Sequence, residues 1–362
     1  MPQKKGIGIV GYGGFGEFIH RAWDQMDNAH VVAVCDADSS RNPGGVSFYT
    51  SVVDILADRE VEIVSIATPP STHKDIAIQA LRAGKHVLVE KPLALSVRDG
   101  ELIRDVQRET GRVATVNFVL RYNRIVEILR EIIKAEVLGK LRRMDLRNYA
   151  MQDTVPEGHW FWDRRVSGGI FLEHGVHFFD LASWMASAKA SKVFSLGVER
   201  KPGMEDRVFA AVEYANGVVG TFWHSFSRPR ELETTTFHFA FDLGEIDMIG
   251  WIPLELRIWG WTDNKGLEKI KSFGDQVELH AEPMEHRIVR SSEFDYEVDW
   301  LLDTAITLPD SKLDVYAANL RAIMADLIRA IDDPSHVMRV TLDDALEAVR
   351  IAEEATRFVH PA

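Results

Sequence analysis

The first 120 residues alternate between short apolar runs and longer segments of mixed character. The runs are rich in Val and Ile and lie at residues 6–10, 31–35, 61–66, 85–89 and 113–118. Apolar runs without polar alternation are typical of strands that are covered on both faces, as in a parallel sheet. Amphipathic helices are predicted between them at residues 16–27, 72–82 and 96–109. This order of strands and helices predicts an α/β domain with a doubly wound parallel sheet.

Beyond residue 120 the pattern changes to β-like segments that follow one another closely. They lie at residues 141–151, 193–201, 207–215, 218–226 and 235–242. Asn216-Gly217 between two of them is a strong signal for a tight hairpin, and the short intervals favour antiparallel pairing. Helical patterns follow at residues 313–332 and 342–358. We therefore expect two domains, residues 1–120 and 121–362, the second an α+β domain with an open, mostly antiparallel sheet.

Composition and charge narrow the classes of protein that fit this pattern. Of 362 residues, 46% are hydrophobic and 27% are charged, which is ordinary for a globular chain long enough to bury a full core. The 42 Lys and Arg against 55 Asp and Glu give a net charge of −13, which disfavours binding to nucleic acid. Cys35 is the only cysteine, so neither an intramolecular disulfide nor a cysteine-based zinc site is expected. Without an apolar membrane span or a leader pattern, we expect no membrane association and a cytoplasmic location.

The turn after the first predicted strand carries a glycine pattern suited to phosphates. Its expected contact residues are Gly11, Gly13, Gly14, Phe15 and Gly16. The first glycine permits a tight turn, the next lets the backbone approach a pyrophosphate, and the last lets helix and strand pack closely. The helix N-terminus then supplies N–H donors and a partial positive charge. This context predicts a Rossmann-type dinucleotide-binding domain.

The end of the second predicted strand indicates which dinucleotide binds. Asp36 follows the glycines by about twenty residues, where a carboxylate accepts hydrogen bonds from the adenosine ribose and repels a 2′-phosphate. We therefore expect NAD rather than NADP. Two alternatives stay open, because Asp38 is close enough to share the role and Arg41 is close enough to accept a phosphate.

Two further strand ends carry polar residues and prolines. Thr68, Pro69 and His73 follow the run at 61–66, and Glu90, Lys91 and Pro92 follow the run at 85–89. A residue before proline is held in extended backbone, and ligands of doubly wound sheets bind outside the carboxyl ends of the strands. These positions are therefore expected to bind cofactor, and Lys91 is the residue at which we expect chemistry.

A second candidate cluster follows Ser167-Gly168-Gly169, in a segment that predicts a helix to about Met185. At 100° per residue, Glu173, His177, Asp180 and Trp184 fall on one stripe. His174 lies about 60° from His177 and is either a packed core residue or a substrate contact. The spacing of the two histidines differs from HExxH, and no metal is predicted.

Three residues outside these clusters are candidate substrate contacts. Trp160 and Trp162 precede the glycine pair, and indole faces pack well on sugar C–H groups. The alternative for both is a place in the core or at an interface between subunits. Arg121 follows the last strand of the first domain, where it either reaches the substrate or forms an interdomain salt bridge.

These motifs together resemble the Gfo/Idh/MocA family of oxidoreductases, which includes glucose–fructose oxidoreductase and inositol dehydrogenase. The resemblance is carried by GYGGFG, Asp36, TPPSTH, IAIQALRAG and KHVLVEKPLA. It implies that Lys91 works at the substrate and the nicotinamide. The family pattern GG-x-x-x-D-x-G-x-H-x-x-D matches at His177 and Asp180, whereas Glu173 stands where the family has aspartate.

The resemblance also implies a reaction, namely NAD(P)-dependent hydride transfer at a hydroxyl or carbonyl carbon of a sugar, cyclitol or related polyol. In that reaction His177 takes the hydroxyl proton and Lys91 stabilises the charge on the same oxygen. Glu173 or Asp180 orients His177 or holds a neighbouring hydroxyl. A homodimer or homotetramer formed through the second-domain sheet is implied as well. Two other functions stay open: a redox-neutral sugar lyase or hydrolase that uses bound NAD transiently, and a nicotinamide-binding regulator without turnover.

Overall fold

The computed structural model describes residues 4–151 and 155–359, which form two compact units. The first unit contains the residues up to Tyr122 together with Gly158–Asp180 and Tyr316–Glu353. The second contains Asn123–Glu157, Leu181–Val315 and the residues from Glu354 onward. Each unit is therefore assembled from segments that are far apart along the chain.

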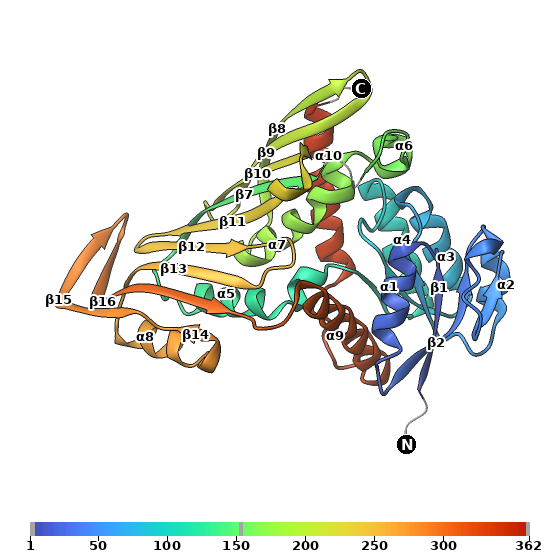
Figure 1. Ribbon diagram of the computed structural model, residues 1–362, viewed down its shortest axis with the longest axis horizontal. Coiled ribbons are helices and arrows are strands. Elements are labelled where there is room, and N and C mark those ends of the chain that lie inside the picture. Colours follow the sequence, from blue (N-terminus) through green and yellow to red (C-terminus); the bar gives the residue numbers. More distant parts are fainter. Residues whose placement is uncertain (1–3, 152–154, 360–362) are drawn as a thin grey trace. The chain divides into compact units, whose positions relative to one another are not determined.

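The first unit is built on a six-stranded parallel sheet (Figure 1). Its strands are β1 (Lys5–Val10), β2 (Ala29–Cys35), β3 (Ser47–Tyr49), β4 (Ile63–Ile66), β5 (His86–Val89) and β6 (Ala114–Val116). Their order is β3-β2-β1-β4-β5-β6. Successive strands are added on one side of β1 as far as β3, and the chain then continues with β4 on the other side of β1. The central strands β1 and β4 are almost completely buried, as their apolar runs predict. The expected doubly wound sheet is confirmed.

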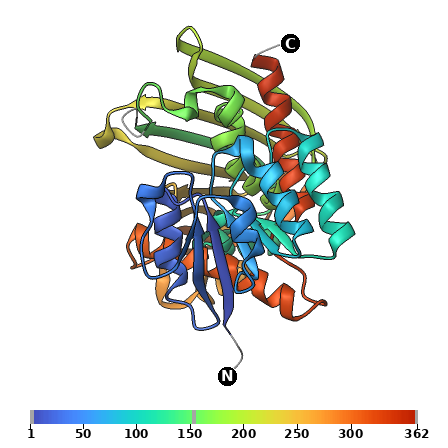
Figure 2. The same cartoon turned by 90° about the vertical axis from the view of Figure 1, so that its right-hand side faces the viewer.

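Helices lie on both sides of this sheet, as the turned view shows (Figure 2). They are α1 (Gly14–Trp23), α2 (Val52–Ala57), α3 (His73–Arg82) and α4 (Val97–Thr110). Ser96 caps α4, since its hydroxyl accepts a hydrogen bond of 3.1 Å from the backbone N–H of Asp99. Gly84 ends α3 with φ of +80°, a conformation that favours glycine. Strand-to-strand connections of this kind are right-handed, so helices after β1 and after β4 cover opposite faces.

Several short helices and two long ones complete the first unit. Short elements are η1 (Ser39–Arg41), η2 (Pro70–Thr72), η3 (Val119–Tyr122), η5 (Trp160–Trp162), α6 (Arg164–Ser167) and η6 (Phe171–Gly175). The helix α7 (Val176–Ala186) follows η6 directly, and α9 (Lys312–Asp332) and α10 (Leu342–Val359) close the fold. Parts of α7, α9 and α10 belong to this unit, although they come late in the sequence.

The second unit is built on a ten-stranded sheet. Its strands are β7 (Leu141–Met151), β8 (Ala190–Lys201), β9 (Met204–Tyr214), β10 (Val219–Arg228), β11 (Thr234–Phe241), β12 (Gly244–Ile249), β13 (Glu255–Thr262), β14 (Val277–Glu278), β15 (Ala281–Ser291) and β16 (Phe294–Thr307). The order is β14-β16-β13-β12-β11-β7-β10-β9-β8, with β15 paired to β16. Only β7 and β10 pair in parallel among these strands, so the expected open, mostly antiparallel sheet is confirmed.

The second unit also contains short helices and a core with aromatic side chains. Its helical elements are α5 (Arg124–Lys134), α8 (Asn264–Lys271), η7 (Arg230–Leu232) and η8 (Gly274–Gln276). In the core, the ring centroids of Phe237 and Phe239 are 4.6 Å apart. The predicted hairpin is present, because Asn216-Gly217 connects β9 to β10 and Gly217 has φ of +84°. Within residues 4–151 and 155–359, no helix has the length and apolar character that a membrane span requires.

Candidate functional site

The turn between β1 and α1 needs glycine at two positions. Gly11 has φ of +94°, and a Cβ there would lie 2.6 Å from the carbonyl oxygen of Ala67. A Cβ on Gly16 would lie 2.3 Å from the carbonyl oxygen of Gly11, so helix and strand approach as closely as predicted. Around Gly14 no described atom lies within 4 Å of such a Cβ. The first turn of α1, whose N–H groups have no partner inside the helix, therefore begins beside open space.

Asp36 lies directly after β2 and is held by its neighbours. Its carboxylate accepts hydrogen bonds from the backbone N–H of Tyr12 at 2.8 Å and of Asp38 at 2.9 Å. The Arg41 guanidinium lies 3.2 Å from the same carboxylate. The other carboxylate, Asp38, caps η1 by accepting from Ser40. Asp36 is therefore the fixed acceptor at this strand end, and Arg41 is the nearest cation to it.

A cavity of about 570 Å³ lies beside this turn, within the size range of small-molecule sites. It is lined by Gly11, Gly13, Gly14, Asp36, Arg41, Thr68, Pro69, His159 and Trp160, among others. Backbone N–H groups, a carboxylate and apolar walls thus surround one space. These are the donors and acceptors that a pyrophosphate, a ribose and an adenine require, so the residues present fit a dinucleotide.

His73 has a different place from the one expected. It is fully buried, and its Nδ1 and Nε2 lie 2.7 Å from the carbonyl oxygen of Pro92 and 2.8 Å from that of Thr68. Burial lowers the pKa of this imidazole, against the opposing effect of the two carbonyl contacts. The expectation that His73 contacts cofactor is therefore corrected, because the ring instead joins the loop after β4 to the loop after β5.

Lys91 forms an ion pair with Glu173 at the carboxyl end of β5. Its ammonium donates to Glu173 Oε1 at 2.6 Å and to the Glu173 backbone carbonyl, also at 2.6 Å. Both side chains are mostly buried, with 16% and 14% of their surfaces exposed. An ammonium has three N–H donors, so two are used by Glu173 and one is left for a further acceptor.

The segment that carries Glu173 is not the regular helix that the sequence predicts. Residues Phe171–Gly175 form a π-helix, and the α-helix begins only at Val176. A π-turn shifts the angular register and releases a carbonyl from the usual i to i+4 bond. The predicted stripe is therefore interrupted at Glu173, whereas His177, Asp180 and Trp184 all lie in the regular helix α7. Glu173 turns to Lys91, and Trp184 packs under the Arg130 guanidinium at 4.0 Å.

Two histidines lie in the segment beside this ion pair. His174 is half-buried, 5.7 Å from Phe178 and 6.5 Å from His177 between ring centroids. Burial and the Lys91 charge lower the pKa of His174 to about 3, so this ring is neutral at physiological pH. His177 has 4% of its surface exposed, and its ring lies 6.3 Å from that of Phe118.

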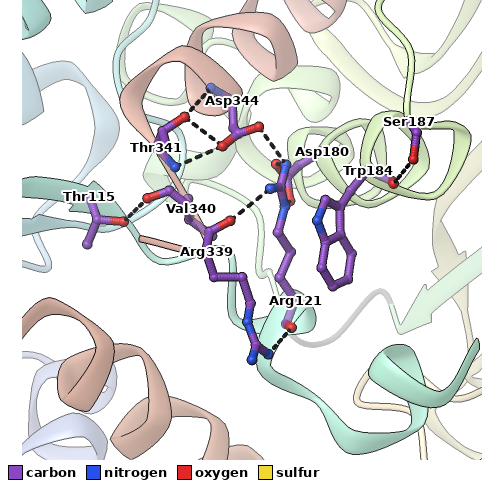
Figure 3. A network of polar contacts seen from close by, with 9 residues as sticks. All are labelled: Thr115, Arg121, Asp180, Trp184, Ser187, Arg339, Val340, Thr341 and Asp344. Atoms are coloured by element: carbon purple, nitrogen blue, oxygen red, sulfur yellow. Dashed lines mark hydrogen bonds and ion pairs between the residues drawn. The ribbon is translucent and has the colours of Figure 1, made fainter. Parts of the chain in front are cut away.

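Arg121 and Asp180 pair with one another inside the first unit (Figure 3). Arg121 Nε and Nη2 donate to the two Asp180 oxygens at 2.9 and 2.6 Å, and Nη2 lies 3.3 Å from Asp344. Arg121 Nη1 donates to the Arg339 carbonyl, and Arg339 returns a bond to the Arg121 carbonyl. Burial raises the pKa of Asp180 to about 6, while Arg121 opposes that rise. These contacts place Arg121 in a salt bridge, which is one of its two expected roles, although the pair lies within one unit, and they make Asp180 the partner of Arg121.

The two candidate tryptophans separate in the structure. Trp160 lines the cavity beside the glycine turn. Trp162 packs edge-on against the buried Phe161, with ring centroids 4.9 Å apart. Trp160 is therefore placed for the dinucleotide cavity, and the packing of Trp162 fits the alternative of a core residue.

The structure also brings in two polar residues that the sequence did not predict. Asn117 donates to the Glu90 carboxyl at 2.5 Å. Tyr316, from α9, stacks its ring 6.3 Å from Phe15 and 5.2 Å from Phe18. Their partners lie far away in the sequence, and the only local sign for Asn117 is an amide directly after an apolar run. Among the described residues, no group of three or more His, Cys, Asp or Glu side chains is arranged to hold a metal ion.

Comparison with known proteins agrees with this geometry. The fold and the glycine cavity define a class, the doubly wound proteins that bind a dinucleotide. A profile described as an oxidoreductase family with an NAD-binding Rossmann fold matches residues 5–118, and one for a GFO/IDH/MocA C-terminal domain matches residues 126–246. The chain therefore belongs to the GFO/IDH/MocA family of oxidoreductases, and its first matched segment is an NAD-binding Rossmann domain.

Individual proteins of known name or structure share only low sequence identity with this chain. The chain is 29% identical to scyllo-inositol 2-dehydrogenase (NAD(+)) of Bacillus subtilis over 173 residues, which are 46% of this chain and 49% of that protein. It is 26% identical to 2,7-anhydro-N-acetylneuraminate hydratase of Escherichia coli over 228 residues, 60% of this chain and 61% of that protein. The chain thus matches less than two thirds of the length of either relative. The crystal structure of GenD2 from gentamicin A biosynthesis in complex with NAD has a TM-score of 0.76 at 22% identity, covering 100% of this chain and 95% of that one, and this likeness shows the fold.

Proposed function

We propose that this protein is an NAD-dependent oxidoreductase that transfers a hydride at a hydroxyl or carbonyl carbon of a sugar, cyclitol or related polyol. The observation that carries the proposal is Lys91, whose mostly buried ammonium keeps one free donor at the strand edge used by the glycine cavity. The likeness to an inositol 2-dehydrogenase supports a polyhydroxylated substrate. The polyol is accordingly the small-molecule partner, with no role for nucleic acid or membrane.

The cofactor would be held by the cavity residues. Gly11, Gly13, Gly14, Phe15 and Gly16 would bind the pyrophosphate through backbone N–H groups, and Asp36 would accept from the adenosine ribose. Thr68, Pro69 and Trp160 would form the adjoining walls, and Glu90 and Lys91 would lie at the nicotinamide end. Asp36 favours NAD, since a 2′-phosphate would meet its charge, although Arg41 at 3.2 Å would partly offset that repulsion. When bound, NAD supplies the hydride acceptor or donor.

The chain's own residues would handle the substrate oxygen and its proton. Lys91 would donate its remaining N–H to that oxygen and stabilise negative charge on it. Glu173 would hold the ammonium in place through two contacts of 2.6 Å. His177 would accept the hydroxyl proton as a general base, and neutral His174 would contact a neighbouring hydroxyl. Asp180 and Arg121 would position the helix that carries His177 from the buried pair they form.

A binding titration followed by a substrate screen tests this proposal. NADH and NADPH fluorescence titrations of wild type and Asp36→Ala should show tight NADH binding that weakens in the variant. Sugars and cyclitols are then screened with NAD by the ultraviolet absorbance of reduced nicotinamide, with Lys91→Met as the control. Binding of neither nucleotide by folded protein contradicts the proposal, and so does NADH binding without turnover of any polyol. The latter result would favour a nicotinamide-binding regulator.

A second candidate function is a redox-neutral reaction in which bound NAD oxidises a sugar and the product is reduced again. The likeness to a hydratase of Escherichia coli favours this candidate. It predicts substrate loss, followed by chromatography or NMR, without net accumulation of reduced nicotinamide. A hydride transfer that leaves NADH in solution separates the two.

The proposal also covers the oligomeric state, the cellular location and the roles of the two domains. On β8, Phe194, Leu196 and Val198 alternate along the strand and are 50%, 58% and 44% exposed. An exposed apolar row on a sheet edge favours association, so we expect a homodimer or homotetramer through this sheet. Light scattering of wild type and Leu196→Glu tests this expectation. We assign the dinucleotide-binding domain to residues 1–120, to which Trp160 adds one wall and from which Lys91 reaches the substrate, and we assign the substrate-binding and assembly domain to residues 121–362, in a cytoplasmic protein.

A further inference from the structure

Glu90 is a second carboxyl group beside the Lys91–Glu173 pair. It follows β5 directly and accepts a hydrogen bond of 2.5 Å from Asn117 Nδ2, with a further contact from the Lys91 backbone N–H. Asn117 is itself buried, with 2% of its surface exposed. Its Oδ1 atom is buried too and has no hydrogen-bond partner among the described residues. The side-chain partner of Glu90 is therefore a neutral amide, not a cation.

The charges that face Glu90 come from three elements. Lys91 is its neighbour after β5, and Glu90 interacts electrostatically with Glu173 of η6 and with the Tyr316 phenol of α9. The Lys91 ammonium is bonded to Glu173, and burial raises the pKa of the Tyr316 phenol, so Tyr316 stays neutral. One ammonium thus serves two carboxyl groups. When both are ionised, this cluster carries one uncompensated negative charge.

The position of this cluster links it to the cofactor cavity. Strands β5, β4 and β1 are neighbours in the sheet, and their carboxyl ends lie at one edge. The Tyr316 ring lies 6.3 Å from that of Phe15 in the glycine turn, and its phenol interacts electrostatically with Glu90. A nicotinamide ring at this edge is a cation when oxidised and neutral when reduced. The missing positive charge is therefore the charge that the oxidised ring would bring.

We propose that Glu90 is the counter-charge for the oxidised nicotinamide, so that binding of NAD⁺ releases the proton of Glu90 whereas binding of NADH leaves it in place. This inference rests on the proposed function and concerns the same site. Burial raises the pKa of free Glu90 to about 7, so the proton is present in much of the protein at neutral pH. Oxidation of an alcohol yields one hydride, which neutralises the ring, and one proton. His177 takes that proton from the hydroxyl first. Glu90 regains one proton once the ring is neutral and His177 has given its proton up, so one proton is released from the alcohol and one is bound within the site.

The dissociation constants of NAD⁺ and NADH, measured across pH, test the inference. In wild type, the affinity for NAD⁺ should rise about tenfold from about pH 6 to about pH 8 and then level, because ionised Glu90 is the binding form. NADH affinity should change by less than about twofold over the same range. Glu90→Gln should bind NAD⁺ with no such slope, whereas the exposed Glu60→Gln control should behave as wild type. A Glu90→Gln protein that keeps the slope overturns the inference.

Calorimetry in two buffers of different ionisation enthalpy counts the protons directly and needs no variant. Near pH 7, binding of NAD⁺ to wild type should release a fraction of a proton and binding of NADH should release none. Equal proton release for both nucleotides overturns the inference, even where Glu90→Gln fails to fold. Polyol turnover with pH-independent NAD⁺ affinity overturns the inference alone. Proton release without turnover of any substrate overturns the proposed function alone, and binding of neither nucleotide overturns both.

Discussion

Two carboxylates of one short segment form ion pairs that differ in how much donor capacity they leave for a ligand. Glu173 and Asp180 are seven residues apart, and each binds a basic side chain from the N-terminal segment of the first unit. The Lys91–Glu173 pair leaves 16% and 14% of its side-chain surfaces exposed, whereas Arg121–Asp180 leaves 3% and 1%. The first pair lies at the strand edge next to the cofactor loops, and the second is sealed among η3, α7 and the start of α10.

The numbers of donors explain this difference. Arg121 directs Nε and both Nη atoms to Asp180, Asp344 and the Arg339 carbonyl, so four of its five N–H groups have acceptors within the protein (Figure 3). Lys91 uses two of its three N–H donors for Glu173, so one remains for a further acceptor. A buried pair whose donors are directed mostly to the protein can fix the fold but offers little to a ligand. A pair with a spare donor at an open edge can bind one.

The largest effect should come from Lys91→Met. This variant removes the ammonium and keeps most of the side-chain volume. We expect kcat/KM for the polyol to fall about 10²- to 10⁴-fold, the range typical of lost acid–base and oxyanion groups. Steady-state kinetics measure it, and circular dichroism checks the fold.

Lys74→Met is the matched control for that change. Lys74 lies in the same unit, on α3, and its ammonium is 3.2 Å from Asp99 in a pair whose side chains are 35% and 32% exposed. Lys74→Met removes the same charge from a residue that neither lines the glycine cavity nor pairs with Glu173, so turnover should stay near that of wild type. Equal loss in both variants would mean that net charge, rather than the Lys91 contact, controls the rate.

The second effect should fall on stability, at the sealed pair. Asp180→Asn removes the carboxylate that accepts two hydrogen bonds from the buried Arg121 and leaves the more distant Asp344, at 3.3 Å, as its charged partner. We expect the free energy of unfolding to fall by about 3 kcal/mol. Chemical denaturation measures it. The double variant Arg121→Met with Asp180→Leu removes both charges and should recover much of that loss. Asp180→Asn with wild-type stability would show that the pair does not hold the fold.

The sequence predicted the first unit well because its signals are local. Continuous apolar runs, the glycine turn, the Ser96 cap and Gly84 each act within a few residues. Helix α5 also carried such a signal, with apolar residues at helical spacing after the Asn123 cap, yet it was not predicted. Strands β12 to β16 were not predicted either. In β15 most side chains are exposed, so the alternation that identifies a strand is missing there.

The sequence identified residues of the candidate site, but it did not predict which side chains contact one another. Lys91 and Glu173 stood out by motif and resemblance, whereas their contact depends on a π-turn that ordinary helical periodicity does not anticipate. Arg121 finds Asp344 and Arg339 across most of the chain, and Glu90 finds Asn117 on the next strand. Such pairings follow from tertiary packing, which a pattern along one sequence does not encode.

A third, smaller effect should appear at the other end of the cofactor cavity. Asp36→Ala removes the carboxylate expected to accept from the ribose, and NADH affinity should fall about tenfold, the worth of one or two charge-assisted hydrogen bonds. NADPH affinity should fall less or rise, because Arg41 loses its 3.2 Å contact and becomes available. Asp38→Ala tests the neighbouring carboxylate, which caps η1 and should matter little for NADH. A larger loss in Asp38→Ala would move the ribose contact to that residue.

The smallest effect should come from Glu173→Asp, which gives the open pair the aspartate of the family pattern. The side chain becomes one methylene shorter, so the carboxylate contact of 2.6 Å with Lys91 is lost or lengthened while the backbone carbonyl still accepts from the ammonium. We expect kcat to change by less than about tenfold, the equivalent of one modest hydrogen bond, with NADH affinity unchanged. Glu173→Gln keeps the length and removes the charge, so it should change the pH profile of kcat more than Glu173→Asp does. If Glu173→Asp instead abolishes turnover, the longer carboxylate touches substrate itself, and the contrast with Asp180 becomes one between a reacting carboxylate and a structural one.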